Sequence, residues 1–187
     1  MKFNGPKVKL SRKLGVTVTP KAKKYLEKKP YPPGQHGQRR RRRLSNYGRQ
    51  LLEKQKLRYQ YNVAERQLRR YYEEATRLKG VAGDNLIRLL ETRLDALVLR
   101  AGFARTIFAA RQYVSHGHLE INGKRVNIPS QQLGENDVLA IREASRKLRC
   151  FNEARGTSAV PSYISVAEDG YSATLNRFPT RDEVPVI

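Results

Sequence analysis

The side chains best suited to acid–base or metal chemistry are His116 and His118, with Glu120 close behind them in the chain. A zinc site needs three or four converging ligands, and no cysteine accompanies this pair. The single cysteine, Cys150, excludes an internal disulfide and a Cys-based zinc site, and we expect it to be buried and inert. Ser45 has no matched base for nucleophilic catalysis. We therefore predict no catalytic residue, no metal, no cofactor and no small-molecule substrate.

Basic side chains dominate the composition. The 187 residues include 38 Lys and Arg against 17 Asp and Glu, which gives a formal net charge of +21. Self-repulsion of this size destabilises a compact chain unless a polyanion screens it. Nucleic acid is the expected partner, because neutralising phosphates releases counterions. An anionic membrane surface is the alternative, but the sequence has no amphipathic anchor, no apolar run of spanning length and no secretory signal. We predict no membrane partner.

The first 43 residues have a composition of their own. They are rich in Lys, Arg, Pro and Gly, show poor apolar periodicity, and end in five consecutive arginines at 39–43. Such a segment favours turns and extended backbone, and its charges repel one another. We predict a basic arm that orders only on its nucleic-acid partner. A solvated tail or a localisation signal is the alternative.

Helical signals follow the arm. Ser45 is a good N-cap for a helix that begins near Asn46, and apolar spacing predicts a second helix over 63–78. On that second helix we expect Tyr71 in the core and Tyr72 half-exposed. Gly80 and Gly83 then break the pattern, and Asp84 suits the N-cap of a third helix.

From residue 84 onward the sequence predicts a small mixed domain. Apolar spacing predicts a helix over 94–101, and a second helix should run from Thr106 to Gly117 with Arg111 facing outward. The Asn122-Gly123 pair is a type I′ hairpin signal between strands 119–121 and 125–128. A third strand is expected at 138–141, helical structure at 144–155, and a further hairpin at 163–166 and 171–175.

Several polar side chains of this domain stand at helix ends, on outward helix positions and in the hairpin, where they could share one surface. Arginine grips phosphate oxygens with two parallel hydrogen bonds and also stacks on bases. Gln112, Ser115 and Asn122 could add neutral hydrogen bonds to phosphates or 2′-hydroxyls. Structured RNA is recognised largely by shape and such backbone contacts. No aromatic pattern for base readout is present, so sequence-specific readout is not indicated.

Successive motifs of this chain resemble those of the ribosomal protein S-four family, bacterial type. They occur in family order over nearly the whole chain and are specific only in combination. The matching stretches are Gly5-Pro6-Lys7, the turn at 33–37, 53–58, 65–67, 89–95, 110–118 and 122–130.

The resemblance implies an α+β fold: a helical body with an extended basic N-terminal arm, plus a small inserted RNA-binding domain of two helices and a short antiparallel sheet. The implied domains are the arm at 1–43, the helical body at 44–91, the small RNA-binding domain at 92–149, and a C-terminal segment at 150–187 that returns to the body as a hairpin.

The resemblance also implies a structural, non-enzymatic constituent of the small ribosomal subunit in the cytoplasm. Such a protein binds a multi-helix junction of small-subunit rRNA early in assembly. It lies near the S-three and S-five proteins and the mRNA entrance, where it influences decoding accuracy. One alternative is a free copy that represses translation of its own mRNA. Another is an RNA-modifying enzyme, for which the length leaves no room.

The residues predicted to bind rRNA combine the basic pattern with the resemblance. They are Lys7, Lys9, Arg12, Lys13, His36, Arg39, Arg40, Arg41, Arg42, Arg43, Arg49, Lys54, Lys56, Arg58, Arg66, Arg70, Arg93, Arg105, Arg111, Gln112, Ser115, His116, His118, Asn122, Lys124 and Arg125.

Two departures from the family pattern limit what carries over. Some members hold zinc through N-terminal cysteines, which this chain lacks, so we predict that the Pro-Gly turn and RNA contacts organise its N-terminal region. Ile107 and Ala96 stand where members often have Arg and Asn, which removes one basic and one polar contact.

Overall fold

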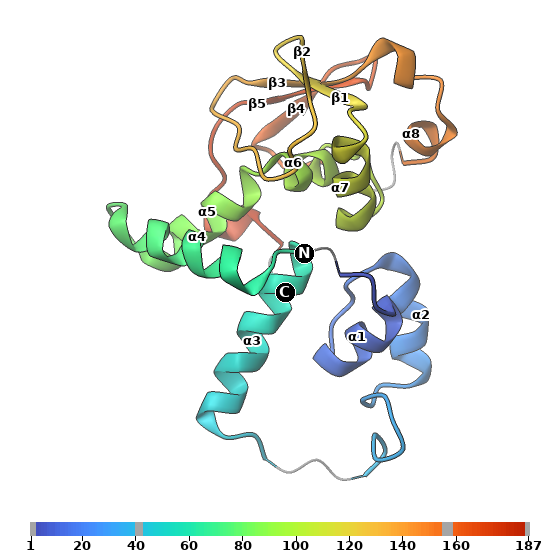
Figure 1. Ribbon diagram of the computed structural model, residues 1–187, viewed down its shortest axis with the longest axis vertical. Coiled ribbons are helices and arrows are strands. Elements are labelled where there is room, and N and C mark those ends of the chain that lie inside the picture. The colour runs from blue at the N-terminus through green and yellow to red at the C-terminus, as the bar shows by residue number, and fades with distance from the viewer. Residues whose placement is uncertain (1–2, 40–42, 155–158, 186–187) are drawn as a thin grey trace. The chain divides into compact units, whose positions relative to one another are not determined.

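The computed structural model describes residues 3–39, 43–154 and 159–185 (Figure 1). Contacts between Cα atoms divide the chain into two compact units, one through Leu68 and one from Arg69 to Pro185. Among the described residues the fold is α+β, with eight α-helices and one five-stranded sheet. None of the described helices has both the length and the apolar character needed to cross a bilayer.

The first unit corrects the prediction of an extended arm. Two helices, α1 (Lys7–Leu14) and α2 (Pro20–Lys28), occupy most of the segment before residue 30 and pack on each other. Lysine and arginine are good helix formers, so a basic composition does not oppose helix formation. A few buried apolar side chains, among them Leu10, Leu14 and Ala22, are enough to pair the two short helices.

Local signals set the helix boundaries that follow. Helix α3 (Asn46–Gln60) begins where predicted, because the Ser45 hydroxyl accepts a hydrogen bond from the Gly48 amide. Helix α4 (Glu65–Arg77) matches the second predicted helix, with Tyr71 buried and Tyr72 exposed. The predicted cap at Asp84 is wrong: α5 (Ala82–Glu91) starts earlier and places Asp84 in its first turn. A carboxylate there still favours the positive end of the helix dipole.

The second unit contains the predicted pair of helices, α6 (Leu94–Arg100) and α7 (Ile107–Ser115). The Thr106 hydroxyl caps α7 by accepting a hydrogen bond from the Ala109 amide. The two helices lie along one face of the sheet and share its apolar core (Figure 1). Ile107 and Ala96 are both buried, so neither position offers a contact to RNA. The predicted helical stretch at 144–155 is shorter, comprising a 3₁₀ turn at Glu143–Ser145 and α8 (Arg149–Ala154).

The sheet joins two hairpins that are far apart in the sequence. Strands β1 (Leu119–Ile121) and β2 (Lys124–Val126) form the predicted hairpin, with positive φ at Asn122 and Gly123. Strand β3 (Val138–Ile141) pairs with β1 on one side and β5 (Ser172–Leu175) on the other. The order is β2-β1-β3-β5-β4, with β4 at Ile164–Val166.

The resemblance implied that the C-terminal hairpin returns to the helical body, but in the structure the hairpin does not do so. Its two strands instead extend the sheet of the small domain, because β5 pairs with β3 in register from Val138↔Thr174 to Ala140↔Ser172. Contact with α5 is made after the hairpin, by the 3₁₀ turn at Arg181–Glu183 and by Phe178, which lies under the Arg88 guanidinium.

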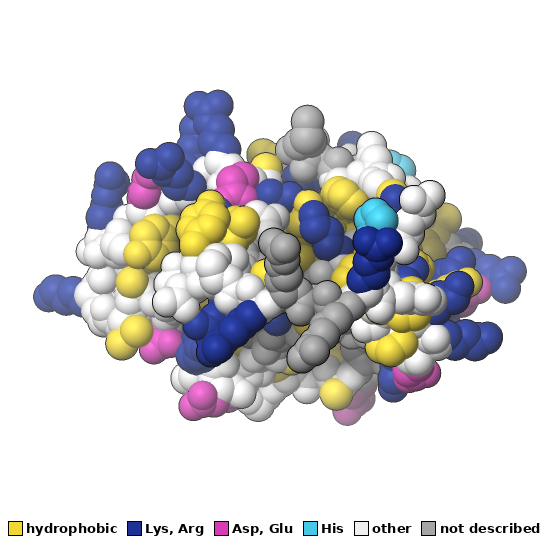
Figure 2. Space-filling model, turned by 90° about the horizontal axis from the view of Figure 1, so that it is seen from below, with side chains coloured by type: hydrophobic (Ala, Val, Ile, Leu, Met, Phe, Trp, Pro, Cys, Tyr) yellow, Lys and Arg dark blue, Asp and Glu magenta, His cyan; other side chains and the backbone are white. Residues whose placement is uncertain are grey.

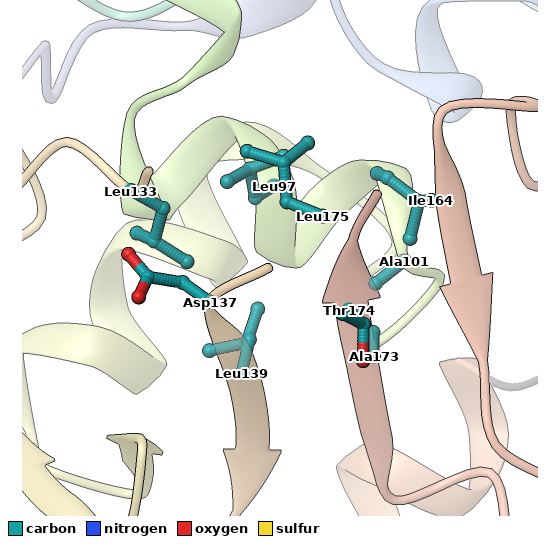
Figure 3. A pocket seen from close by; sticks show the side chains of 9 residues that line it. All are labelled: Leu97, Ala101, Leu133, Asp137, Leu139, Ile164, Ala173, Thr174 and Leu175. Carbon is teal, nitrogen blue, oxygen red and sulfur yellow. The ribbon is translucent and has the colours of Figure 1, made fainter. Parts of the chain in front are cut away.

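A small apolar cavity lies between α6 and strands β3–β5 (Figure 3). Its volume is about 10 Å³. Small-molecule sites usually measure about 300–1,000 Å³. Leu97, Leu139 and Leu175 line it, so it is a packing gap in the core rather than a place for a substrate.

Two buried ion pairs tie the helices of the second unit together. Glu91 is fully buried and binds the Arg100 guanidinium, with Nη2 2.6 Å from Oε1, and the Tyr163 hydroxyl lies 3.3 Å from Oε2. Burial, with the Glu91 charge, raises the pKa of Tyr163. Arg93 and Asp95 form the second pair, which is also inaccessible to solvent.

Candidate nucleic-acid interface

Three predicted contacts of the small domain, His116, His118 and Arg125, converge where α7 meets the β1–β2 hairpin. We call this the α7–hairpin surface and define it by His116, His118, Arg125 and Arg142, grouped around Gly117. The two imidazole rings lie 5.9 Å apart, and His118 Nδ1 is 3.0 Å from the Ser145 hydroxyl. Two arginines and two imidazoles at one turn can bind the anionic groups of an RNA backbone.

The charge on this surface acts on His118. Burial lowers the pKa of His118, and the nearby charges of His116, Arg142 and Arg125 lower it further. Those neighbours disfavour a further positive charge, so the imidazole stays neutral near pH 7 and is available as a hydrogen-bonding group. A phosphate bound at this surface would offset the positive potential that His116, Arg142 and Arg125 produce.

Gly117 brings the arginines of this surface close to the backbone. Its φ is +70°, and a Cβ built there would lie 2.6 Å from the Arg125 guanidinium. The Gly117 carbonyl also accepts a hydrogen bond from Arg142 Nη1 at 3.3 Å. The glycine therefore ends α7 and leaves the space that the Arg125 side chain occupies.

Substituting Gly117→Ala should destabilise the second unit by about 1–2 kcal/mol, because an L-residue is strained in the left-handed region. The new methyl group should also displace Arg125 and weaken RNA binding. Urea unfolding measures the first effect and RNA titration the second. Gly123→Ala is the matched control, since its φ is +76° but nothing lies within 4 Å of its Cβ position. Equal RNA affinity for the two variants would contradict the role given to Gly117.

Arg111 lies on α7 and is restrained by Asp95. Its Nη1 is 3.6 Å from Asp95 Oδ2, and a quarter of its side chain, 25%, is exposed. The prediction that it faces outward is therefore correct only in part. The buried Asp95 carboxylate already binds Arg93. It restrains the Arg111 side chain without fully neutralising the charge of Arg111. Gln112 and Ser115, on the same helix, are exposed as a contact requires.

Two predicted contacts of the small domain have polar groups that form hydrogen bonds within the protein. Arg93 is 1% exposed and donates to Asp95 and to the Tyr71 hydroxyl. The Asn122 amide donates to Asp137 Oδ1 at 2.8 Å and accepts from the Val138 amide at 2.9 Å, which holds the hairpin against β3. Arg93 is therefore unavailable to RNA, whereas the exposed Asn122 amide keeps further donor and acceptor capacity.

In the first unit, basic side chains of α3 gather around one carboxylate. Lys54 Nζ lies 2.5 Å and Arg58 Nη1 3.0 Å from the two oxygens of Glu65. The hydrogen bond from Lys54 is the main cause that lowers the pKa of Glu65, and Arg58 adds to it. Lys56 pairs with Glu53 at 2.8 Å. These pairs orient the cations, of which Lys54 is exposed and Lys56 and Arg58 are half-buried, and they leave an excess of positive charge on the helix.

Arg12 also departs from the prediction. It is half-buried, and its guanidinium donates to backbone carbonyls of the segment after α2 rather than pointing outward. The interaction with its own chain occupies Nε–H and one Nη2–H, and it restrains the Arg12 side chain against the loop.

The remaining predicted residues lie at the surface of their own units. Among the described residues these exposed side chains are Lys9, Lys13, His36, Arg39, Arg43, Arg49, Arg66, Arg70, Arg105 and Lys124, and Lys7 is half-buried. Figure 2 shows separate groups of Lys and Arg side chains, interspersed with hydrophobic and acidic ones. The predicted contacts at Arg40, Arg41 and Arg42 lie outside the described residues.

Sequence reasoning missed Arg142 and assigns no role to Arg146. Arg142 reaches Gly117 from the end of β3, and Arg146 lies 4.9 Å from the Tyr171 ring centroid. One signal in the sequence could have indicated these two arginines: several basic residues follow strand 138–141 directly. The pattern of that segment, however, predicts only a helix. The distance in sequence between Gly117 and Arg142 conceals their contact.

The described residues do not assemble a metal-binding group. No three His, Cys, Asp or Glu side chains in 3–39, 43–154 and 159–185 converge as metal ligands would. Cys150 is half-buried rather than buried as predicted, and it neighbours Tyr113. Burial raises the pKa of Tyr113 to about 12, which keeps its hydroxyl protonated at neutral pH.

Comparison with known proteins agrees with this geometry. Residues 2–91 match the family model "Ribosomal protein S4/S9 N-terminal domain", and residues 92–139 match "S4 domain". The small ribosomal subunit protein uS4 of Micrococcus luteus is 51% identical over 185 residues, covering 96% of this chain and 89% of that protein. The uS4 proteins of Thermobifida fusca and Chlorobium limicola are 47% and 46% identical, covering 100% and 98% of this chain and 94% and 92% of theirs.

The two family models adjoin at residue 92, and most of the α7–hairpin surface lies within the second, with Arg142 just beyond its end. Sequence identity near one half over almost the full length excludes a different family. The chain therefore belongs to the uS4 family of small ribosomal subunit proteins.

Proposed function

We propose that this chain is a primary rRNA-binding protein of the small ribosomal subunit that holds a multi-helix junction. As a member of the uS4 family it is a ribosomal protein and not an enzyme. In the proposed role it joins the RNA early in assembly, in the cytoplasm. It lies beside the S-three and S-five proteins near the mRNA entrance and contributes there to decoding accuracy.

One observation carries this proposal: the α7–hairpin surface. His116, His118, Arg125 and Arg142 come from a helix end, a hairpin and the end of a third strand, yet meet around one glycine. Such convergence favours recognition of shape and backbone in structured RNA over readout of bases. The basic side chains of α3 provide a separate set of phosphate contacts on the first unit.

The proposal is tested by binding of the purified chain to a fragment of small-subunit rRNA that contains the junction. A plain RNA duplex of equal length is the control, and both are titrated across a salt series. We expect the preference for the junction to persist as salt rises, because shape adds to the attraction between charges. Equal affinities that vanish together with salt would show that only net charge drives binding, and would refute a junction-specific role.

A further inference from the structure

The segment between α2 and the arginine run is held by one side chain from α1. Arg12 Nε lies 3.3 Å from the Lys29 carbonyl oxygen and 3.1 Å from that of Tyr31, and Nη2 lies 3.3 Å from that of Pro32. Its guanidinium carbon is also 4.9 Å from the centroid of the Tyr31 ring. A planar fork of donors can satisfy several carbonyls at once, which a lysine ammonium on a flexible stem cannot reproduce.

Beyond Pro32 the chain closes on itself. The Gly37 amide donates to the Gly34 carbonyl at 3.1 Å, and the Arg39 amide donates to the His36 carbonyl at 3.2 Å. The backbone passes so close to Pro32 that a Cβ at Gly37 would overlap the Pro32 carbonyl oxygen.

A side-chain contact adds to this closure. Gln38 Nε2 lies 3.1 Å from the Tyr31 hydroxyl, and Tyr31 is the residue whose ring and carbonyl both contact Arg12. The contacts that shape this loop are therefore made within the chain.

The closed loop lines an open surface hollow of about 440 Å³. That volume is within the range of sites that hold one small ligand. Pro32 and Pro33 give it an apolar side, the glycines expose backbone, and His36 and Arg39 bring polar groups that are exposed at the surface. An apolar face beside a cation and an imidazole suits a nucleotide unit, which has a flat base or ribose next to a phosphate.

We infer that residues 31–39 form a preformed receptor for one nucleotide unit of an RNA strand, and that Arg12 is its positioning residue. The inference rests on the proposed function and deepens it. Arg12 acts through the loop, whereas His36 and Arg39 contact the nucleotide. In this arrangement the hydrogen bonds from Arg12 to backbone carbonyls organise residues 31–39.

The first measurement uses the free full-length chain. Amide hydrogen exchange of Gly37 and Arg39, followed by NMR, should be faster in Arg12→Lys than in the wild type, because lysine keeps the charge but cannot bind the three carbonyls together. Lys13→Gln is the matched control: it removes one exposed charge from the same helix and should leave exchange unchanged. Identical exchange in Arg12→Lys and the wild type would overturn the positioning role.

The second measurement is affinity for the junction fragment. Arg12→Lys and Arg39→Gln should each weaken binding by about tenfold, the cost of one charge-assisted contact. Their double variant should be no weaker than Arg12→Lys alone, because loosening the loop already removes the contact that Arg39 makes. If the two effects add, Arg12 contacts RNA independently of the loop and the inference fails. Arg39 is exposed, so its substitution leaves the fold intact.

Failure of the proposed function would give a different experimental result from failure of the receptor. The wild type itself would then show no preference for the junction over the duplex, before any variant is compared. The exchange measurement needs no RNA and would still decide whether Arg12 holds the loop. A wild type that prefers the junction, with an Arg39→Gln variant that binds equally well, would refute the receptor alone.

Discussion

Replacing Arg93 with alanine should reduce the free energy of unfolding by about 3–5 kcal/mol, which is the usual cost of breaking a buried ion pair from one side. Arg93 binds Asp95 through two hydrogen bonds of 2.9 and 2.7 Å and donates a third of 2.7 Å to the Tyr71 hydroxyl. Asp95 is fully buried, and without Arg93 its nearest remaining cation is Arg111, at 3.6 Å. An uncompensated buried carboxylate is what makes the destabilisation large.

Urea unfolding of the intact chain measures this destabilisation. Arg69→Ala is the control, because Arg69 is an exposed arginine on α4 that pairs with Glu73 in the next turn. Exposed pairs of this kind contribute about 0.3–0.5 kcal/mol. The double variant Arg93→Met with Asp95→Leu should recover most of the stability, since it removes both charges from the interior. A midpoint for Arg93→Ala equal to that of the control would show that this pair does not stabilise the fold.

The largest expected effect on function comes from Arg111→Ala combined with Arg125→Ala. Arg111 is restrained by Asp95 on α7, and Arg125 occupies the space at Gly117. If both bind phosphates, the slope of log affinity against log salt should become shallower by about 0.7 to 0.9 for each arginine removed. Affinity for the junction fragment should fall by about tenfold for each.

Arg77→Ala combined with Arg181→Ala removes the same charge from two other exposed positions of the second unit. This control should lower affinity for junction and duplex alike, without the larger decrease at the junction. Folding of the test variant should be close to the wild type, because Asp95 keeps both hydrogen bonds from Arg93. An unchanged affinity and salt slope for Arg111→Ala with Arg125→Ala would remove these two arginines from the interface.

Local chemistry made several elements of this fold predictable. Ser45 and Thr106 each cap a helix through a bond to an amide three residues later, and Asn122-Gly123 adopts the positive φ values that a tight hairpin needs. Such signals act over a few residues and therefore survive in any tertiary setting. The same holds for the buried face of α6, where Leu94, Leu97 and Val98 follow helical spacing.

The candidate site was less predictable, because all arginines look alike in a sequence. The pattern of basic residues in the sequence assigns the same role, rRNA binding, to Arg93, Arg12 and Arg125. Yet the first is buried against Asp95, the second binds backbone carbonyls and the third lies on Gly117. Their surroundings separate them, and these include residues distant in the sequence: Tyr71 lies 22 residues from Arg93, and Tyr31 lies 19 residues from Arg12.

By itself the sequence determined the sign of the partner's charge, the family, the helix caps and the first hairpin, because each depends on composition, motif order or neighbours within a turn. Only the tertiary structure decided that the N-terminal segment contains two packed helices and that β5 joins β3 in one sheet. It also decided which basic groups remain at the surface. Those outcomes depend on contacts between residues far apart in the chain, where burial and pairing override local preference.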